Sequence, residues 1–226
     1  MDSRNLSRIT VFAGHYGSGK TNIAVNYALF ASKHKDNVVI ADLDIVNPYF
    51  RTKDADKVLA ENGVRLISSP YANTNVDTPA LPPEAYAVIH DKSTTGIIDV
   101  GGDDRGALAL GRYTPSIIEE NNYEMLFVIN KYRYLTADAQ STLEVMCEVE
   151  EAASMKFTGI VNNSNLGDET TAETVLASSD YANEVAKLSG LPIKMTTVKA
   201  NLVQELEDKI ENLFPIDLYV RQSWQK

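Results

Sequence analysis

The chain has little of what several classes of protein require. It holds one cysteine, Cys147, among 226 residues, so it cannot form an internal disulfide or supply the several thiolates of an iron–sulfur cluster. Basic residues are also scarce, because 21 Lys and Arg face 31 Asp and Glu, for a formal net charge of −10. Such a balance does not suit a surface that neutralises phosphate backbones. We therefore expect no iron–sulfur cluster and no nucleic-acid partner.

Long apolar runs are absent as well. No stretch approaches the ~18 apolar residues that cross a bilayer, and the segment before Gly14 contains only a short apolar run, Ile9–Ala13. This run is too short for a signal peptide. We expect a cytoplasmic protein without a membrane partner, and the length suits a single domain over residues 1–226.

Short β-branched runs alternate with helical stretches along the whole chain. The predicted strands are Ile9–Ala13, Val38–Asp42, Val64–Ser68, Gly96–Val100, Met125–Asn130, Phe157–Asn162 and Ile193–Val198. The predicted helices lie near residues 20–34, 53–62, 83–91, 105–120, 136–152, 179–189 and 200–213. Several strands are continuously apolar, as in sheets covered on both faces. The pattern predicts an α/β fold: a doubly wound, mostly parallel sheet of about seven strands with helices on both faces.

Residues 14–21, GHYGSGKT, follow a predicted strand and open a predicted helix. This spacing and context are those of a phosphate-binding loop. Glycines let the backbone N–H groups turn toward phosphate oxygens, Lys20 reaches the β- and γ-phosphates, and the Thr21 hydroxyl ligates Mg²⁺. The predicted nucleotide-binding residues are Gly14, Gly17, Ser18, Gly19, Lys20, Thr21 and Asn22. The loop predicts a P-loop NTPase that binds a nucleoside triphosphate with Mg²⁺.

Two acidic segments leave predicted strands at the edge where ligands bind in open α/β sheets. Asp42 ends the predicted second strand, and Asp44 follows two residues later. Asp44 is the candidate for positioning the attacking water and for serving the metal. Asp42 is either a supporting carboxylate or an ordinary strand-end acid. Asp99 ends an apolar strand and is the candidate Mg²⁺ carboxylate. Gly102 follows it, and its N–H is a candidate contact for the γ-phosphate, which would let the loop sense hydrolysis.

With these segments the chain resembles the ParA/MinD-type P-loop ATPases of the CobQ/CobB/MinD/ParA nucleotide-binding group. The resemblance implies an ATPase that uses ATP and Mg²⁺, with Lys20, Asp44 and Gly102 as catalytic residues and Thr21, Asp44 and Asp99 serving the metal. It also implies that Asn163, at the end of Gly159–Asn163, reads adenine and that Thr196–Leu202 lines the base pocket. We expect slow basal turnover and an unidentified protein partner whose binding is gated by hydrolysis.

One departure from the family concerns the residue after the first glycine of the loop. Members that sandwich ATP between two subunits carry a lysine there, whereas this chain has His15. An imidazole is mostly neutral at pH 7, so the sequence leaves open whether the protein is a homodimer or a monomer. Arg51, Arg105 and Arg112 follow strand ends and are candidates for a replacement cation, but none is assigned.

Two other families share parts of the pattern. Metallochaperone-type GTPases read guanine with N-K-x-D, and Asn130–Arg133 has an arginine where that carboxylate belongs, so adenine is favoured. Dethiobiotin synthetase, an ATP-dependent small-molecule enzyme, needs a lysine soon after the second strand and an acidic E-G-A-G-G turn, which this chain lacks. Both remain alternatives to the partner-gated ATPase.

Two further features lie outside these motifs. Ser69–Pro83 is a long irregular segment with four of the eight prolines; loops of this length are often functional, and its role is left open. Cys147 falls on the predicted helix 136–152, where we expect a buried, small apolar side chain.

Overall fold

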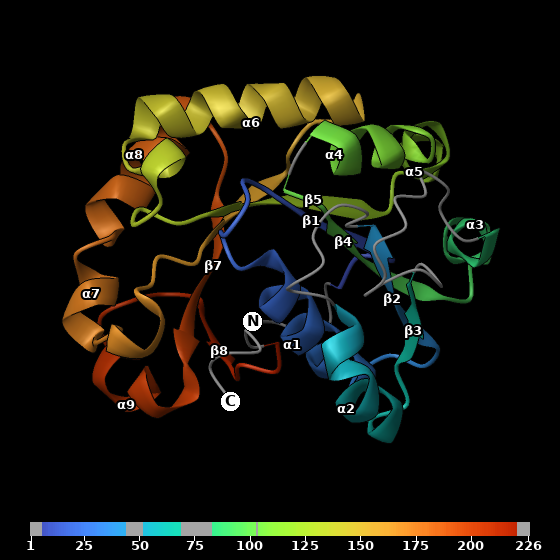
Figure 1. Cartoon of the computed structure of the whole chain (residues 1–226), viewed down its shortest axis with the longest axis horizontal. Coiled ribbons are helices and arrows are strands. Elements are labelled where there is room, and N and C mark those ends of the chain that lie inside the picture. Colours follow the sequence, from blue (N-terminus) through green and yellow to red (C-terminus); the bar gives the residue numbers. More distant parts are fainter. Residues whose placement is uncertain (1–5, 44–51, 69–82, 103, 221–226) are drawn as a thin grey trace.

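The computed structural model describes residues 6–43, 52–68, 83–102 and 104–220, without the side chains of residues 83, 104 and 105. This part of the chain forms one eight-stranded sheet in the order β3-β2-β4-β1-β5-β6-β7-β8, in which all paired strands are parallel (Figure 1). The strands are β1 (Ile9–Ala13), β2 (Val38–Leu43), β3 (Arg65–Ile67), β4 (Thr95–Val100), β5 (Tyr123–Ile129), β6 (Gly159–Asn162), β7 (Ile193–Lys199) and β8 (Leu213–Ile216).

Helices cover both faces of this sheet (Figure 1). They are α1 (Lys20–Ser32), α2 (Asp56–Glu61), α3 (Pro83–His90), α4 (Asp104–Gly111), α5 (Thr114–Glu120), α6 (Ala139–Ala153), α7 (Ala172–Leu176), α8 (Ser179–Ser189) and α9 (Val203–Leu206). Within the described ranges, none is long and apolar enough to cross a bilayer. The predicted α/β fold with a doubly wound parallel sheet is confirmed.

Two predicted elements are wrong in detail. The helix expected near residues 200–213 is a short helical turn with α9, followed by an eighth strand, β8. β8 contains Pro215 and lies at the edge of the sheet, where a missing N–H donor is tolerated. The single helix expected near 105–120 is two helices, because the chain turns at Arg112 and Tyr113 and a proline starts α5.

Each face of the sheet has its own core because side chains alternate along a strand. Val11 and Ala13 of β1 pack on the side of α3, α4, α5, α6 and α8, whereas Phe12 packs on the side of α1 and α2. Cys147 is exposed, contrary to expectation. The face of α6 that packs inward includes Met146, and the next residue lies about 100° further around a helix.

The position of β1 determines where a ligand binds. β1 lies between β4 and β5; the chain passes through β2 and β3 on one side before β4, and later continues from β5 to β8 on the other. The carboxyl end of β1 therefore lies at the point where the connections diverge, which is the usual ligand site of an open parallel sheet.

The chain after β7 returns to the first helix. We call residues 213–220, which include β8, the C-terminal strap. Asn26 of α1 donates to the carbonyl oxygen of Asp217 at 2.8 Å and accepts from its N–H at 3.0 Å. Asn22 likewise donates to the carbonyl oxygen of Val220 at 3.0 Å and accepts from the N–H groups of Tyr219 and Val220, each at 3.0 Å. The strap is thus fixed to the helix that follows the phosphate loop.

A buried arginine fixes the opposite corner. Arg8 donates to the carbonyl oxygens of Val88 and Ile89, at 3.0 and 2.8 Å, near the C-terminus of α3. It also donates to both carboxylate oxygens of Glu120, at the end of α5. These bonds hold α3 and α5 against the start of β1, where the helix carbonyls would otherwise lack partners.

Candidate nucleotide-binding site

The phosphate loop joins β1 to α1, as predicted. A Cβ on Gly14 would lie 2.5 Å from the carbonyl oxygen of Val128 in β5, so no larger residue fits there. Gly19 has φ +90°, and a Cβ on it would lie 2.3 Å from Nδ2 of Asn163. The close approach therefore requires a glycine at position 14. The left-handed backbone and the contact with Asn163 require one at position 19.

The loop curls around the carbonyl oxygen of His15. The N–H of Ser18 and the Nζ of Lys20 both donate to this oxygen, each at 3.1 Å. The N-cap residue of α1, Gly19, has no side chain that could cap the helix, and the first N–H groups of a helix are the groups that bind anions. Within the described residues, the buried hydroxyl of Ser18 has no hydrogen-bond partner.

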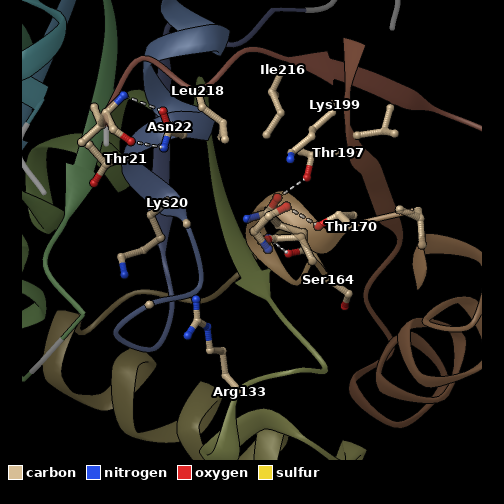
Figure 2. A pocket seen from close by; sticks show the side chains of 18 of the residues that line it. Lys20, Thr21, Asn22, Arg133, Ser164, Thr170, Thr197, Lys199, Ile216 and Leu218 are labelled. Atoms are coloured by element: carbon tan, nitrogen blue, oxygen red, sulfur yellow. Dashed lines mark hydrogen bonds between the residues drawn. The ribbon is translucent and has the colours of Figure 1, made fainter. Parts of the chain in front are cut away.

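A cavity of about 410 Å³ opens beside this loop (Figure 2). Its walls come from the phosphate loop with the start of α1, the segments after β5, β6 and β7, and the C-terminal strap. The lining residues include Gly17, Gly19, Lys20, Thr21, Asn22, Arg133, Asn163, Asn165, Asp168, Thr197, Val198, Lys199, Ile216, Leu218 and Val220. The cavity volume suits a small-molecule ligand.

Asp42 and Asp99, two of the three acids that the sequence places at strand ends, lie on neighbouring strands. Asp42 of β2 is the register partner of Asp99 of β4, and both are buried. Both alternate with residues that pack against α4 and α6, so they face α1. The hydroxyl of Thr52, itself fully buried, donates to Oδ2 of Asp99 at 3.2 Å. Asp44 lies outside the described residues.

Gly102 connects the Asp99 strand to the phosphate loop. A Cβ on Gly102 would lie 2.6 Å from both the N and Cα atoms of Tyr16. The turn after β4 therefore packs directly on the backbone of the loop. A larger side chain at position 102 would therefore displace the backbone of the loop.

Asn163 lies between the phosphate loop and β7. Its Nδ2 donates to the carbonyl oxygen of Ser18 at 2.6 Å, and its Oδ1 accepts a hydrogen bond from the hydroxyl of Thr197. The side chain is buried and lines the cavity. Asn22, another predicted ligand residue, also lines the cavity, but its carboxamide bonds the C-terminal strap (Figure 2).

Two of the three predicted Mg²⁺ ligands, Thr21 and Asp99, lie in the described part of the chain, and the third, Asp44, lies outside it. The Thr21 hydroxyl belongs to the cavity wall, and Asp99 is held by Thr52 at the end of β4. The described residues contain no group of three or more histidine, cysteine or acidic side chains that could hold a metal. Mg²⁺ in a phosphate site needs few protein ligands, because water and phosphate oxygens complete its shell.

The cavity wall holds Lys199, from the segment Thr196–Leu202 expected at the base, and two charged residues to which the sequence assigned no role, Arg133 and Asp168. Arg112 is exposed at the turn between α4 and α5, and Arg51 and the Arg105 side chain lie outside the described part. Arg133, considered in the sequence only as a misfit to a guanine motif, lines the cavity beside Gly17. Asp168 and Lys199 also line it and form an ion pair at 3.3 Å.

No protein-family model and no curated protein matches the chain. Solved structures do. The cell division protein FtsY of Thermotoga maritima is 22% identical, with a TM-score of 0.58 over 93% of this chain and 65% of that one. Chloroplast FtsY of Physcomitrella patens is 18% identical, with a TM-score of 0.57 over 83% and 57%.

The signal recognition particle 54 kDa protein of Aeropyrum pernix, solved in complex with GDP, is 16% identical, with a TM-score of 0.54 over 87% of this chain and 43% of that one. The chain thus spans 65% or less of the length of these three structures. None of the three is a ParA- or MinD-type protein, so these likenesses do not support the resemblance found in the sequence. What these likenesses show is the fold, and this chain has that of a P-loop NTPase.

Proposed function

We propose that this protein is a Mg²⁺-dependent ATPase of the ParA/MinD type, a single nucleotide-binding domain over residues 1–226. The observation that carries the proposal is the placement of Lys20 and Thr21 beside a glycine-built loop, in the wall of a cavity of about 410 Å³. Backbone N–H groups at a helix N-terminus, one lysine and one hydroxyl are the recurrent phosphate-binding set of such enzymes.

Each residue then has a separate role. The N–H groups of Gly17 to Thr21 and the ammonium of Lys20 hold the phosphates, which requires Lys20 to leave the carbonyl oxygen of His15. Thr21 and Asp99 hold Mg²⁺, which neutralises charge on the phosphates when bound. Asp44 orients the water that attacks the γ-phosphorus as the bond to the bridging oxygen breaks. Gly102 places its N–H at the γ-phosphate.

For the base, we propose adenine, held by Asn163 and by the segment Thr196–Leu202. The residues after β5 support this choice, because Arg133 stands where a guanine-reading carboxylate would be and faces the phosphate loop instead. GTP is the second candidate. The Aeropyrum pernix structure holds GDP, and Asp168 in the cavity wall is a carboxylate of the kind that accepts both guanine N–H groups.

Calorimetric titration with non-hydrolysable ATP and GTP analogues in the presence of Mg²⁺ tests the proposal. We expect the wild type to prefer the ATP analogue, Lys20→Ala to lose most of the affinity, and Asp168→Asn to leave ATP binding unchanged. A preference for the GTP analogue that Asp168→Asn abolishes would replace adenine by guanine. Binding of neither nucleotide would refute the proposal as a whole.

We further propose that hydrolysis gates a protein partner in the cytoplasm. The contact between Gly102 and the phosphate loop links the site to its rim, where Tyr16 and Tyr134 are exposed; exposed aromatic side chains favour a protein contact. Steady-state phosphate release should be slow and should fall further in Asp44→Asn. If the wild type binds ATP but releases negligible phosphate, an ATP-dependent enzyme acting on a small molecule is favoured instead. Sedimentation with and without nucleotide distinguishes a homodimer from a monomer.

A further inference from the structure

Arg133 is the charged residue of the cavity that neither the sequence motifs nor the proposed roles account for. Its guanidinium lies against the phosphate loop: a Cβ on Gly17 would be 3.5 Å from its Nε and 3.6 Å from its Cζ. Figure 2 shows the side chain extending toward the loop from the segment after β5, on the same side of the cavity as Lys20. In the described part of the chain, no ion pair or hydrogen bond involving the guanidinium competes with a ligand for it.

The turn that carries Arg133 is firmly held. Asn130, fully buried at the end of β5, accepts from the N–H of Tyr132 at 3.0 Å through its side chain. Its backbone oxygen accepts from the N–H of Arg133 at 3.1 Å and from the hydroxyl of Thr136 at 2.8 Å. These hydrogen bonds hold the backbone of the turn from which the Arg133 side chain extends.

The two residues before Arg133 in this turn are held by hydrogen bonds to the segment after β6 and to α7 and the residue that follows it. The backbone N–H of Lys131 donates to the hydroxyl of Ser164 at 3.0 Å, and its Nζ donates to the carbonyl oxygen of Ala177 at 2.9 Å. The hydroxyl of Tyr132 donates to the carbonyl oxygen of Thr174 at 2.8 Å. These two side chains point toward the β6 and α7 side, while Arg133 lies against the phosphate loop.

We propose that Arg133 binds the phosphate chain of the nucleotide from the same subunit and supplies a second cation beside Lys20. The inference rests on the proposed nucleotide binding. Lys20 and Arg133 line one cavity with the start of α1, and a guanidinium offers paired N–H donors that match phosphate oxygens. A cation in cis would make a second subunit unnecessary for neutralising the phosphates.

The test is calorimetric titration of wild type, Arg133→Ala and Arg133→Lys with Mg²⁺ and the preferred non-hydrolysable triphosphate, and with the matching monophosphate. Arg133→Ala should bind the triphosphate about tenfold more weakly than wild type, or weaker still, because it loses a charge-assisted contact. Monophosphate affinity should change by less than about threefold, and Arg133→Lys should be intermediate because it keeps the charge but not the paired donors. Arg112→Ala, a matched change at an exposed arginine, should bind as wild type.

Three results would overturn the inference. Triphosphate affinity within about twofold of wild type in Arg133→Ala would show that the guanidinium does not contact the phosphates. Equal losses for triphosphate and monophosphate would place its effect elsewhere in the site. A wild type that binds no nucleotide would remove the proposed function and this inference together, whereas the first two results leave the proposed function intact. Should Arg133→Ala unfold at a lower temperature without ligand, Arg133→Gln, which keeps most of the stem, replaces it.

Discussion

The carboxamide of Asn163 donates to the carbonyl oxygen of Ser18 at 2.6 Å, across 145 residues of sequence. This bond joins the end of β6 to the phosphate loop, and Thr197 holds the other end of the same carboxamide. Asn163 therefore supports the loop whether or not it also contacts a base.

Asn163→Ala separates these two roles. It leaves the Ser18 carbonyl and the Thr197 hydroxyl without this partner, which should lower the free energy of unfolding by about 1–3 kcal/mol. If Asn163 acts as a support for the loop, adenine and guanine triphosphate analogues should lose affinity by the same factor. If it reads the base, the ratio of the two affinities should change. Urea denaturation and calorimetry measure the two effects.

Gly102→Ala should displace the phosphate loop, although residue 102 is not part of that loop. The added methyl group would meet the backbone of Tyr16 at 2.6 Å, so the loop must move, and we expect a loss of triphosphate affinity of about tenfold or more. Gly190→Ala is the control. Gly190 has φ +72° with open space around it, so the substitution should cost about 1 kcal/mol of stability and leave ligand binding unchanged. Unaltered binding by Gly102→Ala would contradict the proposed coupling.

The Arg8–Glu120 pair predicts a pH dependence of stability. Hydrogen bonds from Arg8 hold the pKa of Glu120 below its ordinary value. A carboxyl group whose pKa is lower in the folded state stabilises the fold above the pKa of the unfolded chain, and this contribution is lost as the pH falls through the folded value. Glu120→Gln should thus be less stable than wild type at pH 7, and the difference should shrink in acid.

Urea denaturation at pH 7 and at about pH 3 measures this difference. Glu61→Gln is the matched control, because Glu61 forms an exposed pair with Lys57 at 3.9 Å, and such pairs contribute little. A gap between wild type and Glu120→Gln that stays constant with pH would rule out the ion pair as its source.

Asn26→Ala should loosen the C-terminal strap. Asn26 both donates to and accepts from the backbone of Asp217, so its removal should cost about 1–3 kcal/mol of unfolding free energy. Because Ile216 and Leu218 of the strap line the cavity, ligand affinity should fall as well. Asn62→Ala removes a local bond to Val58 at an exposed helix end and should change neither quantity. Equal effects of the two substitutions would refute a special role for Asn26.

The sequence predicted the parts of the site that depend on local spacing. Gly14 to Thr21 follow one another along the chain, and a strand before and a helix after them were visible in the hydrophobic pattern. Contacts between distant segments were not predictable in this way. Nothing in the spacing indicated that Thr52 would bond Asp99, or that Arg133 would lie against Gly17. The strand β8, which pairs with β7 at the edge of the sheet, was missed because a proline and a short apolar run gave no strand pattern.

The C-terminal strap has a consequence for how the chain folds while it is being synthesised. A ribosome releases α1 early, but the apolar surface of that helix packs with Phe214, Ile216 and Val220, which emerge almost 200 residues later. Until then α1 exposes hydrophobic side chains that a chaperone could recognise, and one wall of the cavity is missing. The nascent polypeptide should therefore acquire tight nucleotide binding only after residue 220 has left the exit tunnel.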